Sequence, residues 1–202
     1  QLVNRHFKMG ETQAIGSVVL NWPTGGLNPY CVESACRMGA RMIWMPTRDS
    51  KRSLSFGDMP GDFFQRPGIT VLDEAGKLLP SVYEIFEIAR RYDVPVCTGH
   101  LGMEESVLLC REGRSLGNKM VLTHPEWSRT TVPLQVQKEL AEKGVFIEKC
   151  WLNIAEKDTT EEYMFHTVRE LGCHCVFITT DTGKTTAPPP LEGYQDMLGR
   201  LL

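Results

Sequence analysis

The hydrophobic and polar positions divide the chain into short apolar runs that alternate with amphipathic stretches. Short runs rich in Val, Ile and Leu predict buried strands, and the stretches between them predict helices; this alternation is typical of a parallel sheet. The expected strands are residues 17–21, 42–46, 94–99, 120–123, 145–148 and 175–180. The expected helices are approximately residues 28–39, 80–92, 104–112, 133–143, 159–171 and 191–202.

A further strand end is expected near the start of the chain, where His6 follows an apolar position. This brings the total to about seven strands and predicts an α/β fold, a TIM-like (β/α)8 barrel that is incomplete at the N-terminus. The chain begins with Gln1 rather than Met, so we expect an N-terminal segment that carries the first strand. Residues 1–202 form a single domain in this interpretation, with a loop and β-hairpin insertion at about 47–79 that is long enough to cover the barrel mouth.

Composition narrows the classes of partner and the compartment. The formal net charge is −3 and Lys and Arg are scattered, which argues against a nucleic-acid partner. No apolar run reaches the length of about 18 residues that a membrane span needs. Seven cysteines, an odd number, lie mostly in apolar stretches and indicate reduced thiols in a cytoplasmic protein.

Three of the expected strands end on side chains that can bind a metal ion. His100 follows the strand at 94–99, His124 follows the strand at 120–123, and Asp181 follows the strand at 175–180. In an α/β barrel the C-terminal strand ends meet at one mouth, so these side chains are expected to converge there. Imidazole and carboxylate ligands suit a divalent cation, zinc first, with manganese or iron as alternatives. Such a cation lowers the pKa of a bound water, and a nearby carboxylate, Asp181, takes the proton.

The order of these motifs resembles the amidohydrolase superfamily of metal-dependent hydrolases. The segments that carry the resemblance are Thr98-Gly99-His100-Leu101, Leu122 to Glu126, Phe146 to Glu148, and 69–82, which look closest to an uncharacterised group of bacterial cytosolic proteins. The resemblance implies a TIM barrel with His100 and His124 as metal ligands on strands five and six, and Asp181 as the ligand on strand eight. It also implies a hydrolase that acts on a small polar or carboxylated molecule through a metal-activated water, with His124 polarising the substrate oxygen.

Two features depart from the pattern of that superfamily. The chain contains no His-x-His pair, and its strand at 42–46 is not followed by the lysine that bridges two metals in many members. A binuclear site built on a carbamylated lysine is therefore not expected.

Further residues near the expected mouth are candidates for substrate binding. Arg48 would pair with a carboxylate or phosphate as a bidentate donor, and Glu148 ends the seventh strand. Each also has an ordinary structural interpretation, such as solvation for Arg48 and core packing for the tryptophans that follow the sixth and seventh strands. The full set of substrate-binding candidates is His6, Arg48, Glu148, Trp127 and Lys184.

Three other functions fit the same pattern. A phosphoesterase that resembles the polymerase-and-histidinol-phosphatase group would use Arg48 and Lys184 to hold phosphate. A mononuclear decarboxylase would use the same ligands, whereas a barrel that has lost its metal would act only in binding or assembly. A homo-oligomer is also expected, because the open seam of an incomplete barrel exposes strand edges.

Overall fold

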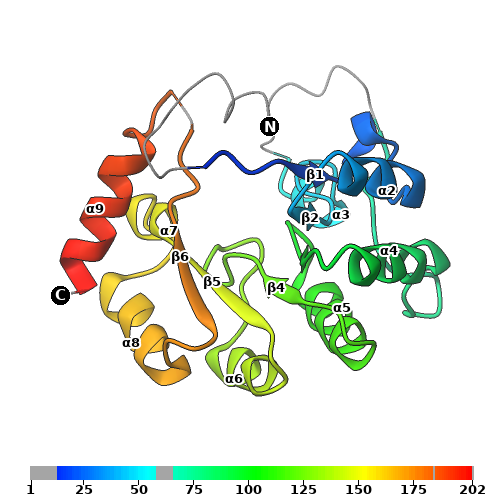
Figure 1. Ribbon diagram of the computed structural model, residues 1–202. Helices are drawn as coiled ribbons and strands as arrows, with labels where there is room; N and C mark the ends of the chain where they lie inside the picture. The colour runs from blue at the N-terminus through cyan, green and yellow to red at the C-terminus, as the bar shows by residue number, and fades with distance from the viewer. Residues whose placement is uncertain (1–12, 58–65, 184, 202) are drawn as a thin grey trace.

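The computed structural model describes residues 13–57, 66–183 and 185–201. Within them the chain forms one parallel sheet of six strands, in which spatial order follows sequence order. Figure 1 shows the strands in an arc, with the long helices on its outer side. The strands are β1 (Ser17–Val19), β2 (Met42–Trp44), β3 (Val96–Cys97), β4 (Met120–Leu122), β5 (Phe146–Cys150) and β6 (Val176–Thr179).

Eight α-helices and one 3-10 helix accompany these strands in the described residues. Along the outer side, α2 packs beside α4, α5 beside α6, and α6 beside α8. The helices are η1 (Trp22–Thr24), α2 (Pro29–Arg37), α3 (Lys51–Leu54), α4 (Pro80–Arg91), α5 (Met103–Ser115), α6 (Leu134–Glu142), α7 (Trp151–Ala155), α8 (Glu161–Leu171) and α9 (Pro190–Leu201).

The predicted α/β alternation is confirmed for these six strands and for the six long helices. The further strand expected near the start of the chain, which ends at His6, lies outside the described residues. Two short helices were not predicted, namely α3 within the insertion and α7 directly after β5. The strand β5 also runs beyond Glu148, its expected end, to Cys150.

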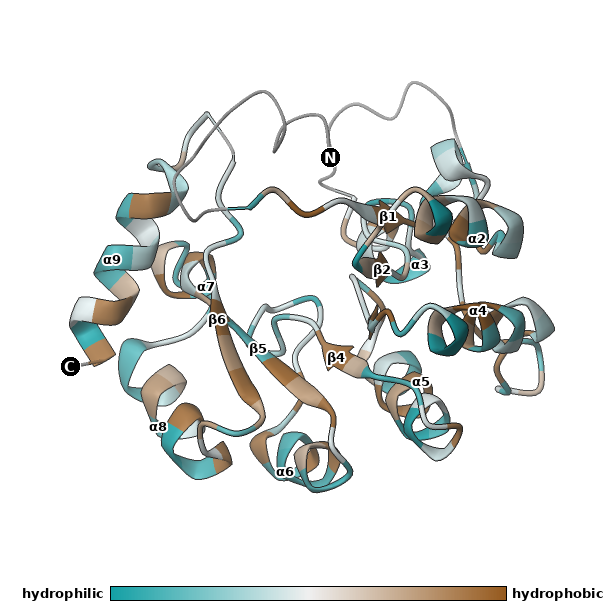
Figure 2. Cartoon of the chain, viewed as in Figure 1, coloured by the Kyte–Doolittle hydropathy of each residue, from teal (hydrophilic) through white to brown (hydrophobic). Residues whose placement is uncertain are grey.

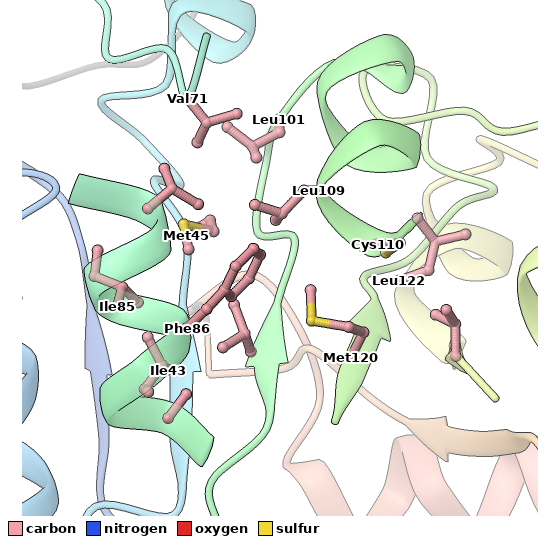
Figure 3. Packing of buried hydrophobic residues seen from close by; sticks show 14 of the residues in the cluster. Ile43, Met45, Val71, Ile85, Phe86, Leu101, Leu109, Cys110, Met120 and Leu122 are labelled. Carbon is pink, nitrogen blue, oxygen red and sulfur yellow. The ribbon is translucent and has the colours of Figure 1, made fainter. Parts of the chain in front are cut away.

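The main core lies between the sheet and the outer helices. The side chain of Phe86, on α4, packs in one cluster with Ile43 of β2 and Met120 of β4 (Figure 3). All three are at most 1% exposed. Figure 2 shows hydrophobic residues along β4, β5 and β6, whereas the outer helices carry both kinds of residue, as amphipathic helices do.

A smaller core cluster packs where α7, α8 and α9 meet. Trp151, the first residue of α7, belongs to this cluster, and its indole N–H donates to the carboxylate of Asp196 at 2.8 Å. None of the helices in residues 13–57, 66–183 and 185–201 combines the length and the apolar character that crossing a membrane requires.

The insertion that follows β2 is folded back onto the sheet. Lys51 N donates to Ile69 O at 2.7 Å, which joins the start of α3 to the extended segment around Ile69. Leu72 and Leu78 form an antiparallel bridge that closes a tight turn. The insertion therefore brings α3 close to the C-terminal end of β3, where His100 lies.

Candidate active site

His100 and His124 come together because they follow neighbouring parallel strands at the same edge of the sheet. Two hydrogen bonds join the chain segments just beyond β3 and β4. Thr123 N donates to the Thr98 hydroxyl at 2.9 Å, and Gly99 N donates to the Thr123 hydroxyl at 3.1 Å. The centroids of the two imidazole rings are 5.3 Å apart. His100 and His124 are 24 positions apart in the chain, and the pairing of the adjacent strands β3 and β4 is enough to bring them together.

Two hydroxyl groups, one from the short helix α3 and one from the loop after β4, orient the imidazole rings. The Ser53 hydroxyl, on α3, lies 3.3 Å from Nδ1 of His100, and the Thr130 hydroxyl lies 3.3 Å from Nδ1 of His124. The Thr130 hydroxyl also donates its single proton to the backbone oxygen of His124, at 2.9 Å. It can therefore only accept from the ring, so Nδ1 of His124 carries the proton and Nε2 keeps a free lone pair.

Burial keeps both imidazoles neutral. Burial lowers the pKa of His100 to about 3, together with the repulsion from His124, when that ring is protonated, and from Arg129. It also lowers the pKa of His124 to about 4. At neutral pH both rings are therefore uncharged, which is the form that binds a metal ion or accepts a proton.

Glu148 lies on β5, beside the strand that carries His124. Its carboxylate accepts a hydrogen bond from the backbone N–H of His124 at 3.1 Å. Burial raises the pKa of Glu148 to about 7, and the negative charges of Asp181 and Glu126 also raise it. The hydrogen bond from the His124 backbone acts in the opposite direction and lowers this pKa. Glu148 is therefore close to half protonated at neutral pH, which suits a group that transfers protons.

A cavity of about 180 Å³ lies at this edge of the sheet. The side chain of Asp181 borders it from the loop after β6, where the backbone has a φ of 50°. The cavity is lined by Val19, Trp44, Thr47, His100, Thr123, His124, Glu148 and Asp181. The three side chains expected to bind metal thus border one cavity, although the described residues hold no group of three or more His, Cys, Asp or Glu arranged to hold a metal ion.

Trp127 forms an aromatic wall beside the two histidines. Its ring meets those of His100 and His124 edge to face, with centroids 4.8 Å and 5.2 Å away. The guanidinium of Arg129 lies over the same indole, 4.8 Å from its centroid. Trp127 thus restricts how the imidazoles can rotate, and Arg129 brings a positive charge close to the site.

The other substrate-binding candidates lie elsewhere. Arg48 is exposed on the loop after β2 and is not among the residues that line the cavity, whereas its neighbour Thr47 is. Trp151, the tryptophan after the strand that Glu148 was expected to end, has the core packing given above as its structural interpretation, in the smaller core cluster. His6 and Lys184 lie outside the described residues.

Several residues of the site were not predicted. Ser53 and Thr130 orient the histidines from irregular or very short elements, and no periodic pattern marks such positions. Trp44 and Val19 line the cavity from strand positions that the apolar pattern assigned only to the sheet. Only Thr47 could have been predicted, because it directly follows a predicted strand end and such positions lie at the barrel mouth.

Fold and site together define an α/β protein with a small cavity, bordered by two histidines and two carboxylates, at the C-terminal edge of a parallel sheet. The chain belongs to the family of unknown function DUF6282, whose model matches residues 1–148. The matched segment includes His100, His124 and Glu148, and it ends before Asp181. No curated protein matches the chain.

Proposed function

We propose that this protein is a metal-dependent hydrolase of the amidohydrolase type, acting on a small polar or carboxylated molecule. In this proposal the six-stranded sheet is the larger part of a TIM-like (β/α)8 barrel. The observation that carries the proposal is the pair of neutral imidazoles, His100 and His124, beside a carboxyl group whose pKa is raised towards neutrality. A buried set of this kind, in a cavity at the C-terminal edge of a parallel sheet, is typical of an active site.

The chemistry of the donors fits a divalent cation, with zinc as the first choice. Protein hydroxyls occupy Nδ1 of both His100 and His124, which leaves Nε2 of each ring for a metal ion. Asp181 is the third ligand that we propose. Because three donors are not already grouped in the described residues, the loop after β6 would have to bring Asp181 closer to the imidazoles.

A bound cation would lower the pKa of a water molecule and polarise the substrate oxygen. The residues of the chain have separate tasks. Glu148 holds or releases a proton near neutral pH, and its hydrogen bond to the backbone of His124 keeps the two groups in contact. Trp127 shields the imidazoles on one side.

The size of the cavity limits the substrate. Ligand pockets for drug-sized molecules are on the order of 300–1,000 Å³. The cavity here, about 180 Å³, is smaller than that. It suits a small molecule, or the reacting end of a larger one.

Metal content tests the proposal. Protein freed of metal with a chelator and then dialysed against zinc should hold zinc at one ion per chain by elemental analysis. His100→Ala and His124→Ala should each lower that content at least tenfold, whereas His166→Ala, which removes an exposed histidine from α8, should not. Zinc bound equally by all four proteins would contradict the proposal.

Two results would favour the other functions. About three metal ions per chain would point to the phosphoesterase. No metal in the unaltered protein, with the cavity still binding small molecules, would point to a barrel that serves only in binding.

A further inference from the structure

A buried polar cluster lies next to the candidate site but outside its cavity. The ammonium of Lys149, on β5, forms an ion pair with the carboxylate of Glu126 and donates to Oε1 of Gln137, on α6, at 2.9 Å. Gln137 Nε2 in turn donates to Glu126 at 3.2 Å. Lys149 and Gln137 are 0% exposed and Glu126 is 4% exposed, so water does not screen the cluster.

Burying this cluster has an unfavourable desolvation free energy. Burial lowers the pKa of Lys149, against the opposing effect of the Glu126 carboxylate, which shows that desolvation disfavours the charge. Apolar residues of similar volume often replace a buried ion pair without loss of stability, whereas removing one partner alone is strongly destabilising. Stability by itself therefore does not account for the cluster, and its position in the fold becomes the more informative property.

The cluster joins the two segments that carry the site. Glu126 lies two residues after His124, and Lys149 directly follows Glu148. Because side chains alternate along a strand, Glu148 faces the cavity while Lys149 faces the helices. Gln137 also donates to the backbone oxygen of Val132 at 2.7 Å, which ties down the far end of the same loop.

The backbone of His124 needs such support. Its φ of 23° is unusual for a residue other than glycine, and conformations of this kind persist only where the surroundings enforce them. The same residue donates its N–H to Glu148 and holds its ring at the cavity. A loop that relaxed at Glu126 would release both interactions.

We infer that Glu126, Gln137 and Lys149 form a positioning cluster that holds His124 against Glu148. The inference rests on the proposed function in that His124 is taken as a working residue of the site. The three residues touch neither the cavity nor a substrate, and they act through the backbone of His124.

Hydrogen exchange at the His124 amide tests the inference without any metal or substrate. In the double variant Glu126→Met/Lys149→Met, this amide should exchange at least tenfold faster than in the unaltered protein. The Ile147 amide, on β5, donates to Cys175 O just before β6, at 2.7 Å. Its exchange rate should change less than twofold. Equal acceleration at both amides, or none at His124, would overturn the inference, because a purely structural role predicts one or the other.

Further variants separate the charge from the hydrogen bonds and keep the test open if the double variant does not fold. Gln137→Met, which removes the anchor on Val132, should speed exchange at His124 at least threefold, and no change there would also overturn the inference. Glu126→Gln removes the charge but keeps a hydrogen-bonding partner for Lys149, so the His124 amide should exchange more slowly in it than in Glu126→Met; equal rates would show that the hydrogen bond does not hold this loop. Lys138→Met, which removes a partly exposed ion pair with Glu170 on the outer side of α6, is the matched control and should leave His124 unchanged.

Zinc binding separates the inference from the proposed function. If His124 binds zinc, the double variant should bind it at least tenfold more weakly, as is common when groups that orient metal ligands are removed. Suppose that the double variant speeds exchange at the His124 amide but not at the Ile147 amide, and that the unaltered protein does not bind zinc. This result would support the positioning cluster and contradict the proposed function.

Discussion

Gly99 is the position where a single added methyl group should disturb the site most. It directly precedes His100, and its φ is 59°. A Cβ atom there would lie 2.4 Å from the backbone oxygen of Met45 and 2.9 Å from that of Pro46. The backbone here is held in place, since Pro46 O accepts from His100 N at 3.0 Å and the N–H of Met45 donates to Cys97 O at 2.9 Å.

The magnitude follows from two contributions. A left-handed conformation costs an L-residue about 1–2 kcal/mol. Crowding in a packed interior adds about 1–3 kcal/mol. Gly99→Ala should therefore lower the free energy of unfolding by about 2–5 kcal/mol, and by displacing the end of β2 from the end of β3 it should also move His100.

Urea unfolding measures this change, and Gly76→Ala is the matched control. Gly76 has a φ of 74°, and a Cβ there would meet no atom within 4 Å. Both variants share the conformational cost and the loss of flexibility in the unfolded chain, so the difference between them isolates the steric clash. If Gly99→Ala is no more destabilising than Gly76→Ala, the close approach of β2 and β3 at His100 is wrong.

Two further predictions concern the pH dependence and the core. Because burial raises the pKa of Glu148 from 4.5 to about 7, the folded protein holds this proton more tightly than the unfolded chain, so stability should fall as the pH rises from about 4.5 to 7. Glu148→Gln should remove that part of the decline, about 3 kcal/mol, in unfolding curves recorded across this range; an unchanged pH profile would refute it. Phe86→Ala should cost about 3–5 kcal/mol, measured by urea unfolding, because it empties the centre of the main core. Tyr83→Ala on the same helix is the control and should cost much less, since Tyr83 is 40% exposed; similar losses would contradict the packing described for Phe86.

Local patterns were sufficient to predict the strands and the long helices. The runs at β2 and β4 are apolar and bounded by helical stretches, and each begins at its predicted residue. The end of β5 was placed too early because Glu148 and Lys149 look like a polar strand terminus. In the structure the strand continues, since Lys149 finds a buried partner in Glu126, which no local pattern reveals.

The candidate site was open to prediction only in part. His100 and His124 stand at the ends of consecutive predicted strands, so their approach follows from topology. The roles of Ser53 and Thr130 do not, because hydroxyls in a loop or in a helix of four residues carry no periodic signal. Arg48 was a wrong candidate for the cavity, since this residue of the loop after β2 is exposed and does not line it.

The sequence by itself determined the order of strands and helices and placed imidazole and carboxylate groups at strand ends, because periodicity and side-chain chemistry are local properties. Tertiary structure decided which ring nitrogen is held, which groups are neutral and which charges are paired. These properties depend on burial and on partners far away in the chain, as with Ser53 and His100, 47 positions apart. Desolvation and hydrogen bonding act through space, so only the folded arrangement sets them.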